Sequence, residues 1–176
     1  MNFVAIDFET ADYGRDSACA VALVRVEQGR IVERAATLIR PPRREFVFTY
    51  LHGIGWEDVE DQPTFAEAWP RLEGIIDGAE FLAAHNATFD SGVLRACCRA
   101  GRLPLPDIPF RCTVQVARRV WGIYPTRLNL GCERLGIPLR HHDAASDAEA
   151  CARILIAASE AGPNPFGTRP RRPLRS

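Results

Sequence analysis

The sequence has no lysine, and its basic residues bring no excess of positive charge. All 22 basic residues are arginine, and 22 Asp and Glu residues balance them, so the formal net charge at pH 7 is zero. We therefore do not expect a broad positive field that would hold nucleic acid over a whole surface. Arginine can bind phosphate bidentately, but a biased genome composition also produces an all-arginine chain, and we draw no function from it.

Long hydrophobic runs are also absent. No apolar run approaches the roughly 20 residues that a membrane-spanning helix requires. The N-terminus enters an apolar strand at once, without the basic segment, apolar region and cleavage site of an export signal. We therefore expect a soluble, cytoplasmic protein with no membrane partner.

Cysteine is present, but without the CxxC spacing that is typical of zinc and redox sites. The six cysteines lie within apolar patterns, and we expect them to be reduced core residues: Cys19, Cys97, Cys98, Cys112, Cys132 and Cys151. The 176 residues, of which 47% are hydrophobic and 25% charged, fit one globular domain of ordinary size.

The first apolar stretch carries two acids. Residues Phe3–Phe8 read FVAIDF and predict a strand, and Glu9 follows Asp7 at an interval of two residues. Because a strand repeats every two residues, Asp7 and Glu9 project from the same face, about 6 to 7 Å apart. Burying two such carboxylates is costly unless cations or donors compensate them. The economical compensation is a divalent metal ion.

The rest of the chain alternates between β-type and helical patterns. Two β-rich runs, Cys19–Val26 and Ile31–Ile39, flank Glu27-Gln28-Gly29-Arg30, which predicts an antiparallel hairpin. Residues 43–63 are predicted to be a long irregular connection. A helix capped by Thr64 and ended by Gly78 follows, and then a strand over Glu80–Ala84 and a helix with Asp90 in its first two turns. The remaining predicted elements are a strand over Phe110–Cys112, helices over Thr113–Val120 and Leu128–Leu135, and a helix from Ala144 to a cap at Gly162. This pattern predicts a mixed sheet with helices packed on it.

Four carboxylates and one histidine stand where these elements meet. They are Asp7, Glu9, Asp90, His142 and Asp147. A single acid at a helix start is usually a cap or a partner of the helix dipole. A strand end with DxE, a strand-to-helix junction with HNxxFD and a helix start with HxAxxD would cluster only if all of them served one site.

These segments resemble a known family. IDFET at 6–10, HNATFD at 85–90 and HDAASD at 142–147 are similar to the three exonuclease motifs of the DEDDh group of DnaQ-like 3′–5′ exonucleases, in the same order and at similar separations. The resemblance covers about residues 1–158. It implies an α/β, RNase H-like fold: a five-stranded mixed sheet of order 3-2-1-4-5, whose first three strands form an antiparallel meander, with helices on both faces.

The resemblance also implies roles for the clustered residues. Carboxylate oxygens suit hard ions, so two divalent cations, Mg²⁺ or Mn²⁺, are expected on Asp7, Glu9, Asp90 and Asp147, with Asp7 bridging both. His142, whose unperturbed pKa is about 6.5, would take the proton from the attacking water. His141 doubles this histidine, but only His142 has the HxAxxD spacing to Asp147.

Three further residues are assigned to the substrate by resemblance. Thr10 and His52 look like residues that line the pocket of the terminal nucleotide, and Phe89 would pack against the site. For His52, a loop histidine bonded to backbone is an equally open interpretation.

The sequence therefore predicts an exonuclease domain over residues 1–161 and a mobile tail, rich in Pro and Arg, over residues 162–176. The expected reaction is removal of nucleoside 5′-monophosphates from the 3′ end of a single strand, with DNA preferred, as in a polymerase III epsilon-like proofreading activity partnered by a DNA polymerase. The alternatives are an RNA-trimming or oligoribonuclease-type exoribonuclease, a non-catalytic nucleic-acid-binding or polymerase-accessory module, and a structural domain whose acids are only caps.

Overall fold

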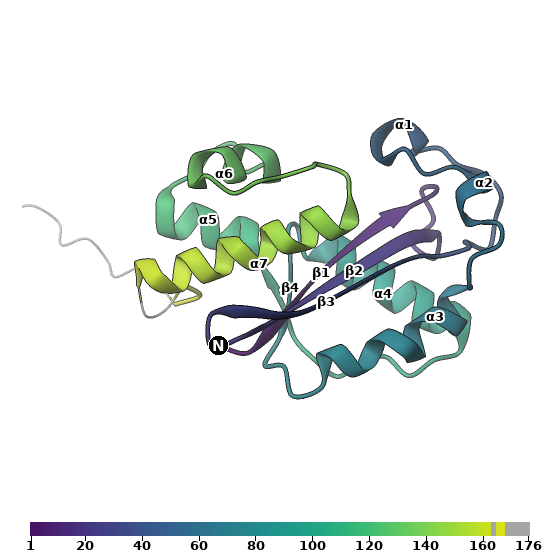
Figure 1. The fold of residues 1–176 in the computed structure, drawn as a ribbon, viewed down its shortest axis with the longest axis horizontal. Coiled ribbons are helices and arrows are strands. Elements are labelled where there is room, and N and C mark those ends of the chain that lie inside the picture. Colours follow the sequence, from purple (N-terminus) through teal and green to yellow (C-terminus); the bar gives the residue numbers. More distant parts are fainter. Residues whose placement is uncertain (163–164, 168–176) are drawn as a thin grey trace, which may run out of the picture.

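A five-stranded mixed sheet forms the centre of the molecule (Figure 1). The computed structural model describes residues 1–162 and 165–167. The strands are β1 Phe3–Thr10, β2 Ala18–Glu27, β3 Arg30–Leu38, β4 Leu82–Ala84 and β5 Phe110–Cys112, in the order β3-β2-β1-β4-β5. Strands β1, β2 and β3 pair antiparallel, and β4 and β5 are added in parallel. The predicted fold class, strand order and meander are confirmed.

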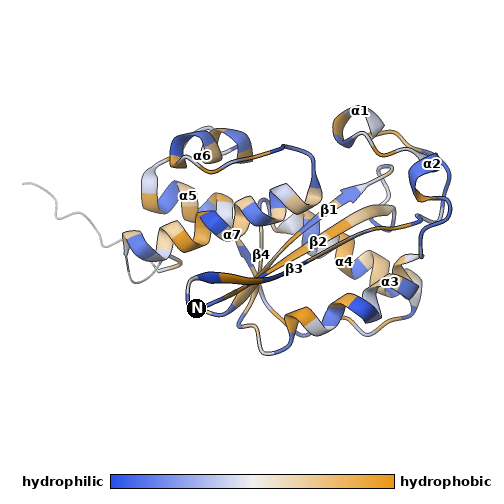
Figure 2. Ribbon diagram, in the orientation of Figure 1, coloured by the Kyte–Doolittle hydropathy of each residue, from blue (hydrophilic) through white to orange (hydrophobic). Residues whose placement is uncertain are grey.

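Helices cover both faces of this sheet. The longer ones are α3 Phe65–Leu72, α4 Thr88–Gly101, α5 Thr113–Trp121, α6 Leu128–Leu135 and α7 Ala144–Ala161. Helices α5, α6 and α7 lie on one side of the sheet, and α3 and α4 lie on the other (Figure 1). Strands β1 and β2 are hydrophobic along most of their length, as central strands must be when both faces are covered (Figure 2).

Alternation along β1 sets which side chains face which layer. Phe3 and Ala5 pack in the core under α7, whereas Val4 and Ile6 pack in the core under α3 and α4. Asp7 continues the first of these two series, so the two acids of β1 belong to the face that α7 covers.

Small side chains let α7 lie close to the sheet. Ala148 and Ala152 of the helix are fully buried against a core that includes Ala20 and Ala22 of β2. The distance between a helix and the layer beneath it depends on the side chains at the contact. Alanine on both sides therefore brings the first turn of α7 near the end of β1.

The predicted hairpin turn is confirmed. Glu27 pairs with Arg30, and the two residues between them have positive φ angles, 50° for Gln28 and 77° for Gly29. Two successive left-handed residues are the geometry of a type I′ turn, which matches the twist of the flanking strands.

The connection over residues 43–63 is more regular than predicted. It contains two one-turn helices, α1 Thr49–His52 and α2 Trp56–Val59, so the prediction of a wholly irregular segment is wrong. Contacts between residues close in the sequence stabilise these short helices: the Asp58 carboxylate accepts a hydrogen bond from the Gly55 N–H at 2.7 Å.

The predicted capping box after this segment is confirmed, since the Glu67 carboxylate accepts a hydrogen bond from the Thr64 N–H at 2.8 Å. The α-helix that begins after Thr64 ends at Leu72, and a 3₁₀ helix, η1 Glu73–Ile76, follows it directly.

Part of the segment predicted as a mobile tail is packed. The Phe166 ring lies edge-on to Phe81, with 5.2 Å between the ring centroids, and the Arg111 guanidinium lies 5.3 Å from its centroid. Arg119 donates a hydrogen bond to the Pro165 carbonyl at 3.1 Å. The predicted tail also includes residues 163–164 and 168–176, which lie outside the described residues.

Two further sequence expectations concern the described residues. All six cysteines are free thiols, and five of them are buried. Within residues 1–162 and 165–167, no helix is long and apolar enough to cross a membrane.

Candidate active site

The carboxylates of β1 meet the first turn of α7. Asp7 and Glu9 lie near the end of β1, and Asp147 lies one turn into α7. One carboxylate oxygen from each of the three lies within 4.8 Å of the other two. Residues 138 positions apart in the sequence are thus brought to one point, because α7 packs on the face of β1 that carries both acids.

Asp90 comes to this point from the other layer. It lies in the first turn of α4, its side chain is buried with 1% exposed, and its Oδ1 accepts a hydrogen bond from the Phe8 N–H at 3.2 Å. This bond ties the carboxyl group to the backbone of β1 between Asp7 and Glu9.

All five sequence-predicted catalytic residues line one cavity of about 540 Å³. The other lining residues come from β1, the β4–α4 junction and the first turn of α4, α5, the loop before α6 with the first residue of α6, and the loop before α7. The full lining is Asp7, Phe8, Glu9, His85, Asn86, Phe89, Asp90, Val114, Arg118, Thr126, Arg127, Leu128, His141, His142 and Asp147.

Crowding of the acids changes their proton affinity. Burial, followed by the charges of Asp90 and Asp147, raises the pKa of Asp7 well above its usual value. Burial also raises the pKa of Glu9 to about 7, that of Asp90 to about 8, and that of Asp147. Without a cation, the folded protein therefore holds protons on this cluster near neutral pH.

One buried oxygen in the cluster has no partner. Oδ2 of Asp147 accepts from the His142 N–H at 3.2 Å and from the His141 Nδ1 at 3.1 Å. Oδ1 of Asp147 is buried and forms no hydrogen bond in the described part of the chain. Leaving such an atom unpaired is costly unless a ligand satisfies it. An oxygen-only donor set with a spare buried oxygen fits a hard divalent cation.

The two adjacent histidines have different environments. His142 lines the cavity with its backbone in the left-handed region, φ 67°, and its ring stacks on His141 with 3.9 Å between the centroids. Burial, and then the charge of His141, lower the pKa of His142, so its imidazole is neutral at pH 7. His141 donates to Asp147 and also lies against His142. The sequence showed the doubled histidine but not this contact.

The three predicted substrate residues fall into two groups. Phe89 lines the cavity and is 36% exposed. Thr10 and His52 are not among the residues that line this cavity, and they bond to each other: the His52 Nε2–H donates to the Thr10 carbonyl at 3.1 Å. The Nδ1 of His52 accepts from the Ile54 N–H at 3.1 Å, so both ring nitrogens are used by backbone.

His85 opens the HNATFD segment, and the structure shows which groups it connects. Its Nε2 lies 3.1 Å from the Thr126 carbonyl and its Nδ1 lies 2.8 Å from the Thr113 hydroxyl. A carbonyl only accepts, so Nε2 carries the proton and Nδ1 accepts from Thr113. Burial lowers the pKa of His85 and keeps it neutral. The ring thus joins the end of β4 to α5 and to the loop before α6.

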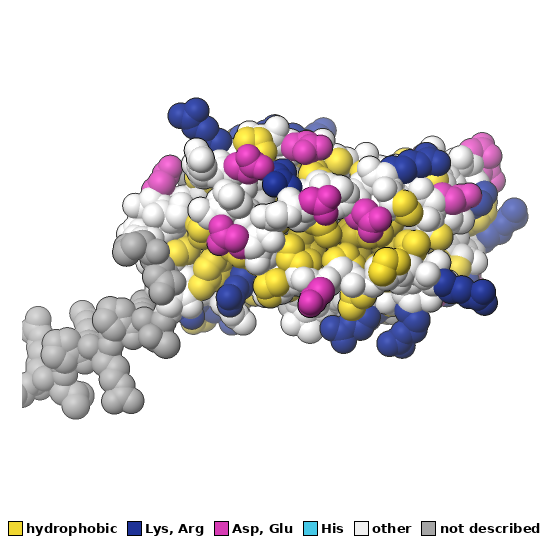
Figure 3. Space-filling view, turned by 90° about the horizontal axis from the view of Figure 1, so that it is seen from below, with side chains coloured by type: hydrophobic (Ala, Val, Ile, Leu, Met, Phe, Trp, Pro, Cys, Tyr) yellow, Lys and Arg dark blue, Asp and Glu magenta, His cyan; other side chains and the backbone are white. Residues whose placement is uncertain are grey.

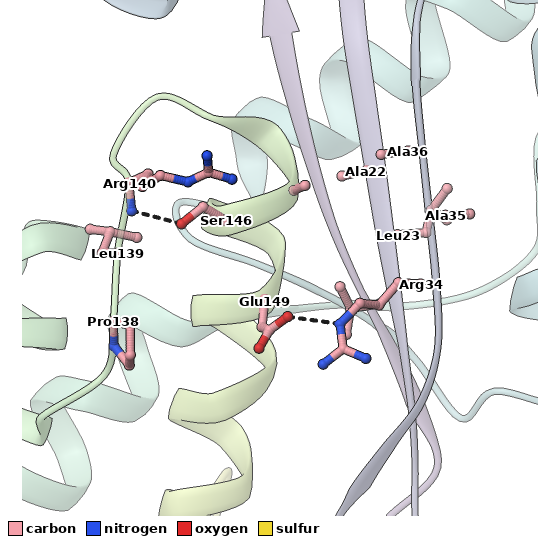
Figure 4. Close-up of a pocket in the computed structure, with 12 residues that line it drawn as sticks. Ala22, Leu23, Arg34, Ala35, Ala36, Pro138, Leu139, Arg140, Ser146 and Glu149 are labelled. Carbon is pink, nitrogen blue, oxygen red and sulfur yellow. Dashed lines mark hydrogen bonds and ion pairs between the residues drawn. The ribbon is translucent and has the colours of Figure 1, made fainter.

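A second cavity, of about 530 Å³, lies between α7 and strands β2 and β3 (Figure 4). Its lining is largely aliphatic, and it contains none of the predicted site residues. Its Arg34 and Glu149 side chains pair with each other at 2.8 Å. Among the described residues, Glu149 is the one acid in this lining, so the cavity has no cluster of carboxylates like that of the first.

Comparisons with known proteins agree with this geometry. A family model described as an exonuclease, RNase_T, matches residues 4–155. A DNA polymerase III PolC-type protein of Thermotoga petrophila is 30% identical over 158 residues, which are 88% of this chain and 12% of that protein. The 3′–5′ exonuclease DinG of Bacillus subtilis is 33% identical over 162 residues, which are 88% of this chain and 17% of that protein.

One solved structure has the same fold over nearly the whole length of both chains. Exonuclease X in complex with 5′ overhanging duplex DNA has a TM-score of 0.74 at 27% identity, over 90% of this chain and 91% of that one. The chain spans only 12–17% of the length of the two relatives named above, so it corresponds to one part of each. From the family match, the fold and the converging acids, we conclude that the chain belongs to the exonuclease family, as a DnaQ-like 3′–5′ exonuclease domain of the RNase H-like superfamily.

Proposed function

We propose that residues 1–161 form a metal-dependent exonuclease that removes nucleoside 5′-monophosphates from the 3′ end of single-stranded DNA. The observation that carries this proposal is the convergence of Asp7, Glu9 and Asp147 within 4.8 Å, together with the unpartnered Oδ1 of Asp147. An acidic cluster of this kind repels a phosphodiester unless cations are bound, so the donor set itself argues for a metal-dependent reaction.

The proposed roles follow from the positions of the side chains. Asp7, Glu9, Asp90 and Asp147 would hold two divalent cations, Mg²⁺ or Mn²⁺. Bound divalent cations supply Lewis acidity, which activates water and stabilises charge on the leaving oxygen. His142 is neutral near pH 7, so its imidazole nitrogen is free to take the proton from the attacking water. Phe89 lines the cavity and is assigned to the terminal nucleotide. For Thr10 and His52, which do not line the cavity, the same assignment is supported by the family resemblance alone.

The relatives support DNA as the substrate class. One is named as a DNA polymerase, and the Exonuclease X structure contains duplex DNA with a 5′ overhang. The PolC-type likeness also supports proofreading beside a polymerase, in which the unpaired 3′ nucleotide of a primer is the substrate. Exoribonuclease activity is the competing proposal, and it predicts a rate on RNA at least equal to that on DNA.

A direct assay tests this proposal. Purified protein is incubated with Mn²⁺ and with matched single-stranded DNA and RNA oligonucleotides carrying a label on the 3′-terminal nucleotide. We expect release of labelled mononucleotide, faster from DNA, abolished by EDTA and by Asp7→Asn. Binding of the oligonucleotide without any release of mononucleotide, whether or not EDTA is present, would support the non-catalytic module instead.

A further inference from the structure

Two arginines share the cavity with the acids. Arg118 comes from α5, and Arg127 is the residue that precedes α6. Five arginines of the described residues pair with carboxylates, namely Arg25, Arg34, Arg43, Arg140 and Arg153. In the described part of the chain, neither Arg118 nor Arg127 forms an ion pair, although four acids line the same cavity. Their charge is therefore available to an external anion.

The Arg118 side chain is held in place by neutral contacts. Its Nε donates to the Thr126 hydroxyl at 2.8 Å, and its guanidinium lies 5.2 Å from the centroid of the Tyr124 ring. Among the described residues, its terminal Nη groups form no hydrogen bond. Part of the entropy cost of fixing a long side chain is thus already met, while the donors that suit a phosphate remain unused.

The loop that fixes Arg118 is itself tied to the catalytic layer. The Thr126 hydroxyl donates to the Ile123 carbonyl at 2.8 Å, so its oxygen lone pair accepts from Arg118. The Thr126 carbonyl accepts from the buried His85, which follows β4 directly. A chain of hydrogen bonds therefore fixes the position of the guanidinium relative to the end of the sheet where the acids lie.

Figure 3 shows the face of the molecule that is seen from below the view of Figure 1. Hydrophobic and acidic side chains occupy the middle of that face, and arginines lie mostly toward its rim. With a net charge of zero, the chain has to bind a polyanion through local cations.

From these observations we infer that Arg118, together with Arg127 of the same cavity, binds the phosphodiester on the 5′ side of the scissile one. This rests on the proposed function. Cations on the four acids would neutralise the scissile phosphate, so the two arginines of the same cavity remain for the next phosphate of the strand. The subsite recognises the sugar–phosphate backbone and not the base, and it strengthens the binding of substrates that have a second phosphodiester.

A pair of substrates tests this subsite. The p-nitrophenyl ester of thymidine 5′-monophosphate contains the scissile phosphate alone, whereas a single-stranded oligonucleotide contains both. For Arg118→Ala we expect the KM for the oligonucleotide to rise about 10-fold or more with kcat changed less than about 2-fold, because a charge-assisted hydrogen bond is lost. Hydrolysis of the ester should change less than about 2-fold.

Salt dependence and control variants complete the test. The slope of log(kcat/KM) against log salt for the oligonucleotide should fall by about 0.7 in Arg118→Ala, as for one single-strand phosphate contact. Arg118→Gln, which keeps a donor for Thr126 but loses the charge, should behave in the same way. Arg99→Ala removes an exposed arginine near the end of α4 and should leave both substrates unchanged.

Two results would overturn the inference. One is an unchanged KM for the oligonucleotide in both Arg118 variants. The other is an equal loss on the ester and the oligonucleotide, which would assign Arg118 to the scissile phosphate or to the structure of the site. Failure of the proposed function is distinct from either, because the unmodified protein would then hydrolyse neither substrate.

Discussion

At the scale of single residues, the two adjacent histidines divide two tasks around Asp147. His141 occupies the outer oxygen of the carboxylate, and His142 presents its ring to the cavity. The stacking of the two rings restricts the orientation of His142. The proposed base, His142, and the residue that hydrogen-bonds to Asp147, His141, therefore stand at neighbouring positions in the chain, and the backbone at His142 is left-handed, with φ 67°.

The first prediction concerns His142. His142→Ala should lower turnover of a single-stranded oligonucleotide by about 10² or more, since a general base is removed, while metal binding persists. Turnover is measured at saturating Mn²⁺, and metal binding is measured separately by calorimetry. Loss of Mn²⁺ binding in this variant would reassign His142 as a metal ligand.

The second prediction concerns His141. His141→Ala should raise the Mn²⁺ concentration for half-maximal activity by about 10- to 100-fold, because partners that orient a metal ligand contribute that much to affinity. Turnover at saturating Mn²⁺ should fall far less than in His142→Ala. His141→Asn keeps a donor at this position and should recover part of the affinity. Equal metal dependence in all three proteins would exclude the positioning role.

At the scale of elements, the site depends on how closely α7 lies on β1 and β2. The alanines in this contact are not replaceable by larger residues without moving the helix, since cores are packed to high density. Movement of α7 carries Asp147 with it and separates the three carboxylates.

The third prediction tests this packing. Ala148→Leu should destabilise the fold by about 1–3 kcal/mol, the usual effect of overpacking a core. It should also lower activity at temperatures where the protein stays folded, because Asp147 is displaced. Glu160→Ala, at an exposed position of the same helix, should change stability by less than about 0.5 kcal/mol and leave activity unchanged. Thermal melts and oligonucleotide assays on both variants supply the measurement.

At the scale of the whole molecule, the acidic cluster links stability to pH and to metal. The pKa of Glu9 is raised to about 7 and that of Asp90 to about 8 in the folded state, above their values in the unfolded chain. Groups with a raised pKa favour the folded state while they are protonated, and this contribution is lost as pH rises through the folded pKa. The buried carboxyls therefore weaken the metal-free fold as pH rises from 7 to 8.5.

The fourth prediction follows from this loss of stability with rising pH. In EDTA, the Tm should fall between pH 7 and pH 8.5, and it should fall less in Asp7→Asn, which removes one charge from the cluster. Mn²⁺ at about 100 times its Kd should raise the Tm of the unmodified protein at pH 8.5 by about 5–10 °C. The increase should be smaller at pH 7, where protons compete with the ion. A Tm that Mn²⁺ raises equally in Asp7→Asn would place the bound ion elsewhere.

Local patterns were enough for most of the fold. The apolar run of β1, the Gln28-Gly29 turn and the Thr64 capping box each depend on neighbouring residues, and the structure has all three as predicted. The short helices α1 and α2 were missed, because four-residue helices have too few positions to show a helical period. The packing of Phe166 was missed because its partners, Phe81 and Arg111, lie far from it in the sequence.

The sequence by itself determined the fold class, the strand order through family resemblance, and the identity of the acids. Motifs and strand periodicity can be recognised from residues that are close together in the sequence, which is why no tertiary contact was needed. Only the tertiary structure decided that α7 brings Asp147 to Asp7 and Glu9, that Asp147 keeps one oxygen unpartnered, and that His141 occupies the other. It also decided that Arg118 and Arg127 face the same cavity without carboxylate partners. These features depend on the spacing between layers, and that spacing results from side chains that meet only in the folded chain.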